Sequence, residues 1–107
     1  MAFPSLEELA LLHTHICRAV GDPRRIQIIY ALADCECNVT TLADRLDMPQ
    51  STVSRHLAIL RQSALVETQR EGASVVYSLA DPRIITLLDN MREMLRDVVE
   101  RQTTALE

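Results

Sequence analysis

The sequence predicts a mainly α-helical domain of four helices, a β-hairpin and a long last helix, in the order α-α-α-α-β-β-α. Apolar residues recur at helical spacing through most of the 107 residues. Two short strand-like runs, residues 65–71 and 74–79, meet at Gly72, which suits the tight turn of a hairpin. Hydrophobic residues make up 48% of the chain, enough for one core, so we expect a single domain over residues 1–107.

Capping residues indicate where the first helices begin. A first helix is expected over residues 5–20, with Ser5 as its N-cap. Asp22 then caps a second helix with Pro23 at its first position, a place where the missing N–H of proline costs nothing. This second helix is expected to end near Ala33.

The later elements follow from similar signals. Asn38 is expected to cap a short third helix over residues 39–46. Pro49 lies at or near the start of a fourth helix that ends near Ser63. After the hairpin, a last helix is expected over residues 81–103.

Composition narrows the class of protein. No apolar run approaches the ~20 residues that span a bilayer, and the N-terminus has neither the basic nor the long apolar region of a signal peptide. Three cysteines are an odd number without a secretory context, so free thiols fit better than a disulfide framework. We therefore expect a cytoplasmic protein that has no membrane contact.

Residues 39–63 have the pattern of two short helices around a tight turn, which is the helix-turn-helix arrangement. The first turns of the second helix are rich in hydrogen-bonding side chains, where an ordinary surface helix more often has Glu and Lys. The net charge is −4, yet residues 50–80 carry three arginines against two acids. We therefore expect this helix to enter the DNA major groove. Its predicted DNA contacts are Gln50, Ser51, Thr52, Ser54, Arg55, His56 and Arg61.

The hairpin over residues 65–79 strengthens this interpretation. A solvated face in some other helical bundle would explain the polar helix alone. A glycine-tipped hairpin directly after it is suited to touch the neighbouring DNA backbone, with Arg70 contacting a phosphate. Together the helices and hairpin predict a winged helix-turn-helix fold, in which residues 65–79 are the wing.

Several stretches resemble one known family. Ser51-Thr-Val-Ser-Arg-His-Leu-Ala-Ile-Leu-Arg closely resembles the recognition helix of the ArsR/SmtB family of bacterial metal- and thiol-responsive repressors. Residues 21–26 resemble the start of that family's second helix, and the wing residues resemble its wing. The resemblance covers roughly residues 6–100. It implies a homodimer that binds an imperfect inverted repeat in double-stranded DNA without a cofactor and releases it when an inducer binds.

Dimerisation is also expected on physical grounds. The helices over residues 5–20 and 81–103 both carry apolar stripes that so small a domain can hardly cover alone. We therefore expect both helices to pack against a second copy of the chain. The predicted interface residues are Leu9, Ile16, Leu88, Met91, Leu95 and Val98.

Cys35 and Cys37 are the predicted inducer site. They lie in a polar connection in which packing hardly explains a pair of thiols, and a turn there would let both thiolates converge on one ion. Cys17 is a candidate third ligand, although its apolar stripe fits a packed side chain equally well. His13, one turn before Cys17, is a further candidate, although such a residue is more often packed or capped.

Two inducer positions known in the family match this sequence poorly. A last-helix site would fall on Asp81, Arg83, Met94 and Asp97, but arginine does not ligate a metal ion. The family's thiol pair would fall on Asn38 and Thr40, so that Cys35 and Cys37 lie slightly upstream.

Soft thiolates nevertheless favour As(III) or Sb(III). Cd(II), Zn(II), and a redox or polysulfide response through the same thiols stay open as alternatives. An enzyme is not expected, because Gly21 and Gly72 are the only glycines and no phosphate-binding loop is present. Two further alternatives are a metallochaperone and a protein-interaction domain that senses nothing, and the polar fourth helix argues against both.

Overall fold

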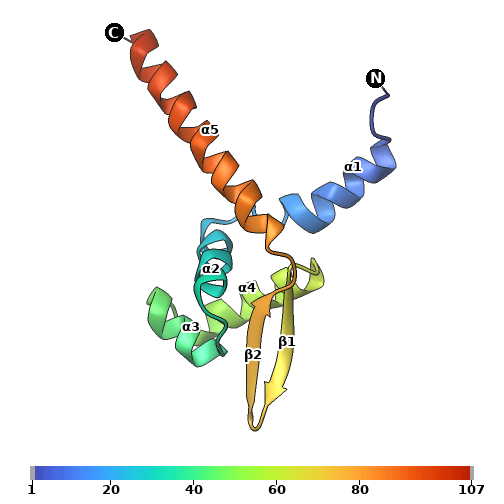
Figure 1. The fold of residues 1–107 in the computed structure, drawn as a ribbon, viewed down its shortest axis with the longest axis vertical. Helices are drawn as coiled ribbons and strands as arrows, with labels where there is room; N and C mark the ends of the chain where they lie inside the picture. The colour runs from blue at the N-terminus through green and yellow to red at the C-terminus, as the bar shows by residue number, and fades with distance from the viewer. Residues whose placement is uncertain (1, 107) are drawn as a thin grey trace.

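The computed structural model describes residues 2–106, with side chains through residue 104. Its elements are α1 (Leu6–Leu12), η1 (His13–Cys17), α2 (Pro23–Asp34), α3 (Val39–Leu46), α4 (Gln50–Gln62), β1 (Val66–Glu71), β2 (Ser74–Leu79) and α5 (Arg83–Leu106). Helices α2, α3 and α4 form a small body from which the hairpin extends, and α1 and α5 project from the other end as two arms (Figure 1). The predicted fold class of helices, a hairpin and a last helix is confirmed.

The predicted caps form as expected. The Asp22 carboxylate accepts a hydrogen bond from the backbone N–H of Arg24 at 2.8 Å, and the Asn38 side chain accepts one from Thr41 N–H at 2.8 Å. Ser5 caps α1 in the same way. Each cap satisfies an N–H group that has no partner within its own helix, so these local signals fix where the helices begin.

The first helix differs from the continuous helix predicted over residues 5–20. The α-helix ends at Leu12, and His13–Cys17 forms a π-helical turn in which Arg18 N–H donates to His13 O at 2.9 Å. The sequence keeps α-helical apolar spacing through this stretch, so apolar spacing alone does not reveal the π-turn.

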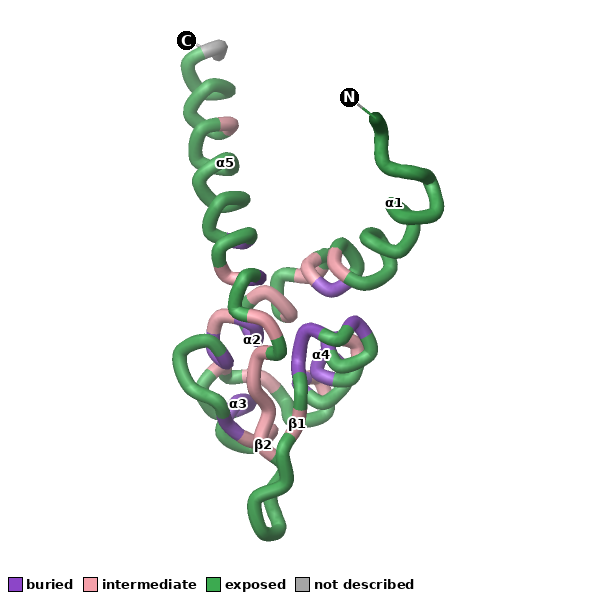
Figure 2. The backbone as a smooth tube through the Cα atoms, turned by 45° about the vertical axis from the view of Figure 1, so that its right-hand side comes forward, coloured by how far each residue is buried: buried purple, intermediate pink, exposed green. Residues whose placement is uncertain are grey.

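The core lies between α2, α3, α4, the base of the hairpin and the first turns of α5 (Figure 2). Its largest fully buried side chains are Ile28, Ile29, Leu42, Leu57, Leu60, Leu88 and Val53. Leu88, one of the predicted interface residues, lies in this core and not on the exposed apolar stripe of α5. The beginning of α5 packs on α2, which leaves Leu88 only 2% exposed within one protomer.

The hairpin is antiparallel, with Val66 opposite Leu79 and Glu71 opposite Ser74. Gly72 adopts a positive φ of 62° at the tip, a conformation that glycine tolerates without strain. The strands contact α4 and α2, so the base of the wing is fixed to the body while its tip is exposed.

Candidate nucleic-acid interface and thiol segment

Helix α4 has two distinct faces. Its inner face buries Val53, Leu57 and Leu60, spaced to form one stripe against the core. The opposite face is polar. Among the predicted DNA contacts, Gln50, Ser51, Ser54, Arg55 and Arg61 are exposed and Thr52 is half-buried. The helix thus presents a row of hydrogen-bonding side chains, of the kind that reads base edges and phosphates.

The position of α4 relative to α3 is fixed locally. Pro49 precedes the first turn of α4, and the Gln50 side chain donates to Thr40 Oγ1 at 3.3 Å across the turn. Between the helices, Asp47 adopts the left-handed conformation with φ of 52° and ends α3. This is the helix-turn-helix geometry that the sequence predicts.

The predicted exposed position of His56 is wrong. His56 is only 4% exposed, because it lies three residues after Val53 and four before Leu60, on the buried stripe of α4. Its Nδ1 lies 3.3 Å from Nη1 of Arg25 on α2. His56 therefore belongs to the contact between α2 and α4 and not to the polar face.

Arg70 lies on the exposed part of the wing. It is in β1, opposite Val75 and two residues before the turn at Gly72. No acidic partner is within ion-pair distance of its guanidinium in the described part of the chain. An unpaired guanidinium on a projecting hairpin next to α4 has the placement that a backbone phosphate contact requires.

The connection between α2 and α3, residues 35–38, carries Cys35 and Cys37 and is called the thiol segment here. It is extended, so the predicted turn at the two cysteines is wrong. Cys35 has φ of −160° and ψ of 124°. The backbone of Cys37 pairs with that of Tyr77 in β2. The Cys37 carbonyl accepts from Tyr77 N–H at 2.8 Å, and the Cys37 N–H donates to the Tyr77 carbonyl at 3.2 Å. This bridge straightens the segment. It also buries Cys37, which is 8% exposed, while Cys35 stays exposed.

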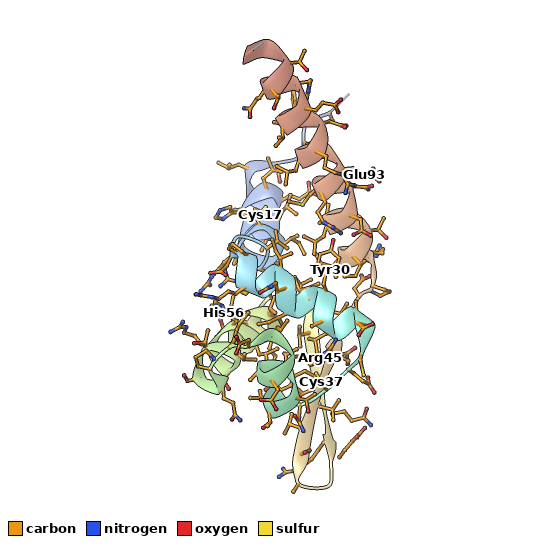
Figure 3. The ribbon with its side chains drawn as sticks, turned by 90° about the vertical axis from the view of Figure 1, so that its left-hand side faces the viewer. Cys17, Tyr30, Cys37, Arg45, His56 and Glu93 are labelled. Carbon is orange, nitrogen blue, oxygen red and sulfur yellow. The ribbon has the colours of Figure 1, made fainter. Side chains whose placement is uncertain are left out.

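Arg45 of α3 holds this segment, a role that the sequence analysis missed. Its Nη1 donates to Ala31 O at 3.1 Å and to Cys35 O at 3.3 Å, and it lies 3.9 Å from Cys37 Sγ. Its Nη2 forms an ion pair with Asp34 at 2.9 Å. One side chain therefore joins the thiol segment to the helix-turn-helix (Figure 3).

The remaining ligand candidates lie elsewhere. Cys17 and His13 are exposed on η1, and Cys17 is far from Cys37, with α2 between them in the view of Figure 3. In the described residues, no three His, Cys, Asp or Glu side chains gather into a group that could hold a metal ion. A site of three thiolates is therefore not assembled within one protomer.

The last-helix position carries an ion pair. The guanidinium of Arg83 lies 2.7 Å from the Asp81 carboxylate. This pairing lowers the pKa of Asp81 to about 2. The negative charge of Asp81 is thus already balanced by the positive charge of Arg83 in the same chain.

The two arms expose apolar side chains. Leu9 on α1 is 42% exposed, and on α5 Met91 and Leu95 are 44% and 60% exposed. Ile16 and Val98, also predicted at the interface, are half-buried in the single protomer. Such a surface is unusual for a protein that stays monomeric. None of the described helices is both long and apolar enough to cross a bilayer.

The fold and the polar face of α4 define a winged helix-turn-helix protein. Residues 22–68 match the model of the arsR family of bacterial regulatory proteins. The chain is 34% identical to the transcriptional regulator KmtR of Mycobacterium tuberculosis over 79% of this chain, and it spans 65% of KmtR, just under two thirds. It is also 34% identical to the transcriptional activator HlyU of Vibrio cholerae, over 74% of this chain and 73% of HlyU.

A solved structure agrees with these matches. A homodimeric winged helix-turn-helix DNA-binding domain from Mycobacterium bovis superimposes with a TM-score of 0.75 at 30% identity, covering 94% of this chain and 95% of that one. The chain therefore belongs to the ArsR family of transcriptional regulators.

Proposed function

We propose that this chain is a homodimeric repressor, acting as one domain over residues 1–107, that binds an imperfect inverted repeat in double-stranded DNA. The observation that carries this proposal is the exposed polar face of α4 beside a wing whose Arg70 has no ion-pair partner among the described residues. We also propose that it has no enzymatic activity, because its polar surface is suited to DNA and not to a small substrate, and that it acts in the cytoplasm, where a regulator of this family would meet its DNA.

The exposed arms support the dimer. A second copy would cover Leu9, Met91 and Leu95, which no part of the described chain buries. A two-fold dimer places two recognition helices about one DNA turn, ~34 Å, apart and so requires an operator with two half-sites. The Mycobacterium bovis domain of the same fold is homodimeric.

Selection of bound sequences from a random DNA pool tests this proposal directly. The expected product is an inverted repeat that the wild-type chain shifts in an electrophoretic assay as one dimer per site. Recovery of a single half-site bound by a monomer would contradict the dimer. Binding with no sequence preference would contradict the operator, and no DNA binding at all would favour an interaction domain that binds only protein. Transcription that rises with the bound regulator would show an activator, as HlyU is named.

We further propose that Cys35 and Cys37 bind a thiophilic inducer, As(III) or Sb(III), and that binding releases the DNA. Cys35 is exposed and provides a first thiolate. Residues two apart in an extended segment point to the same side, so Cys37 is the natural second ligand once its thiol leaves its buried position beside Arg45. Arg45 contacts both cysteines and lies on α3, which gives the inducer a route to the helix-turn-helix.

Other inducers would use the same two thiols, alone or with further ligands. Cys17 and His13 of the partner arm would complete a site for Cd(II) or Zn(II), and two thiols would form a polysulfide bridge. A DNA-release titration with As(III), Sb(III), Cd(II), Zn(II) and polysulfide separates these cases. Release by As(III) and Sb(III) at the lowest concentrations supports the proposal. Release by polysulfide alone, with a sulfur bridge seen by mass spectrometry, would replace it with the redox alternative.

A further inference from the structure

One guanidinium joins the end of the α1 arm to the middle of α4. Arg25, in the first turn of α2, donates from Nε to Ala19 O at 2.9 Å and from Nη2 to Arg18 O at 2.8 Å. Its remaining nitrogen, Nη1, lies 3.3 Å from His56 Nδ1. Arg25 therefore contacts the segment that follows η1 and the candidate recognition helix at the same time.

This contact fixes the protonation state of His56. A guanidinium only donates hydrogen bonds, so Nδ1 of His56 must accept and the neutral ring carries its proton on Nε2. The ring is 4% exposed, and Nε2 has no hydrogen-bond partner among the described residues. A second proton, on Nδ1, would turn the acceptor into a donor and set two cations against each other. Only the neutral ring is compatible with this geometry.

The surrounding charges act mostly in the same direction. Arg24 and Arg25 face His56 from α2, and Arg55 faces it from α4, while Asp22 at the start of α2 is the nearby acid. Burial is the main cause that lowers the pKa of His56. The arginines lower it further, and Asp22 opposes them. His56 is therefore neutral at pH 7, and protonating it in the folded protein is unfavourable.

We propose that Arg25 is a positioning residue for DNA binding and that protonation of His56 breaks the hydrogen bond between Arg25 and His56, so that mild acid releases the DNA. This hydrogen bond is called the tie below. This proposal rests on the proposed function, because it takes α4 as the helix that reads DNA and the α1 arm as part of the dimer. While the tie is intact, Arg25 fixes α4 relative to the dimer axis. Once the tie is broken, the angle and spacing of the two recognition helices are no longer fixed, and affinity falls.

Operator affinity measured by fluorescence anisotropy from about pH 7.5 to about pH 5.5 tests this device. Because the pKa of His56 lies below its ordinary value, the wild-type chain is expected to lose affinity mainly at the acid end of this range, and by less than the roughly tenfold that removing the whole charge-assisted hydrogen bond would cost. Circular dichroism and sedimentation at both ends of the range establish that the protein is still a folded dimer. A flat wild-type profile would overturn the proposal.

Two substitutions separate the tie from general acid effects. His56→Asn keeps an acceptor near the position of Nδ1 and takes up no proton, so its affinity is expected to match wild type at pH 7.5 and to stay level in acid. Arg25→Met removes the tie at every pH, so its affinity is expected to be about tenfold lower at pH 7.5 and nearly pH-independent. The control is His15→Asn, which changes an exposed histidine on η1 and leaves the wild-type profile. An acid loss that survives in His56→Asn, or that disappears in His15→Asn, contradicts the proposal.

The free protein gives a readout that does not depend on DNA. Nitrogen-15 shifts of the His56 ring are expected to show a proton on Nε2 and none on Nδ1 at about pH 7.5. In Arg25→Met, the ring is expected to titrate at a higher pH, because a neighbouring cation is gone. A ring protonated on Nδ1 at neutral pH would disprove the tie even in a protein that binds its operator well. A chain that shows the expected ring but binds no DNA would instead contradict the proposed function.

Discussion

The Sγ atom of Cys37 lies 3.9 Å from Nη1 of Arg45, so a buried thiol between α2 and α3 contacts the helix that leads into α4. The same guanidinium is held by Asp34 at 2.9 Å. A ligand that takes the sulfur of Cys37 must therefore displace or reorient Arg45. This relationship gives the thiol segment a physical connection to the helix-turn-helix, and it leads to the first two predictions.

Cys35→Ser and Cys37→Ser are each expected to keep DNA affinity in the absence of inducer and to lose release by As(III). Serine keeps the approximate size of the side chain but offers no thiolate to a soft ion. The measurement is a DNA-release titration with As(III). Cys17→Ser serves as the comparison, and it weakens the response only if the partner's arm supplies a third thiolate. If a variant with both Cys35→Ser and Cys37→Ser releases DNA at the As(III) concentrations that act on the wild-type chain, this site is ruled out.

Arg45→Met is expected to bind As(III) but to release DNA poorly. Ligand binding is followed by thiolate-to-arsenic absorption and release by anisotropy, so binding and coupling are measured separately. Coupling free energies between sites are typically about 1–3 kcal/mol, so the loss is measurable as a several-fold smaller change in DNA affinity. The matched control, Arg96→Met, changes an exposed arginine on α5. If Arg45→Met releases DNA as wild type does, the inducer acts by another route.

Arg55→Ala is expected to weaken sequence preference while the chain stays a folded dimer. Arg55 is exposed on the polar face of α4, where a bidentate contact to a base edge contributes about 1–3 kcal/mol of discrimination. Competition between the selected operator and a scrambled sequence measures this preference. Arg96→Ala provides the same chemical change on α5. Unchanged discrimination in Arg55→Ala would show that this side chain does not read the bases.

Arg70→Ala is expected to weaken binding almost equally on all DNA sequences. A phosphate contact contributes through counterion release, so the slope of log affinity against log salt should become shallower by about one for each wing arginine. Affinities at several salt concentrations on specific and random DNA provide the measurement. A loss at only one base position would assign Arg70 to base reading.

Leu95→Glu and Leu88→Ala are expected to fail in different ways. Leu95 is 60% exposed in a single protomer, so a carboxylate there leaves the protomer folded but dissociates the dimer in sedimentation experiments. Leu88 is 2% exposed, so its truncation leaves a cavity and lowers the free energy of unfolding by about 2–5 kcal/mol. A Leu95→Glu protein that sediments as an unchanged dimer would place the interface elsewhere.

Local signals account for what the sequence predicts well. Asp22 and Asn38 bond to N–H groups two or three residues further on, and Gly72 tolerates its positive φ for reasons contained in the residue itself. Such features need no knowledge of the rest of the fold, so the helix starts and the hairpin are readable from the chain.

The errors arise from contacts between distant residues. His56 lies on the buried stripe of α4. Its polar side chain suggested an exposed position, although its spacing of three residues from Val53 indicates a buried one. The thiol segment is extended because Cys37 pairs with Tyr77, which no local pattern announces. Arg45 escaped notice for the same reason, since its partners lie at the end of α2 and in the connection that follows.

The arms described above also have a thermodynamic consequence. Most of α1 and the outer part of α5 stay exposed in one protomer, so the apolar surface of these helices leaves water only when a second chain arrives (Figure 2). Folding and assembly are then linked by mass action, and the melting temperature rises with protein concentration. In the proposed dimer, the amount of chain that a cell makes thus sets the fraction that is assembled and able to occupy an operator.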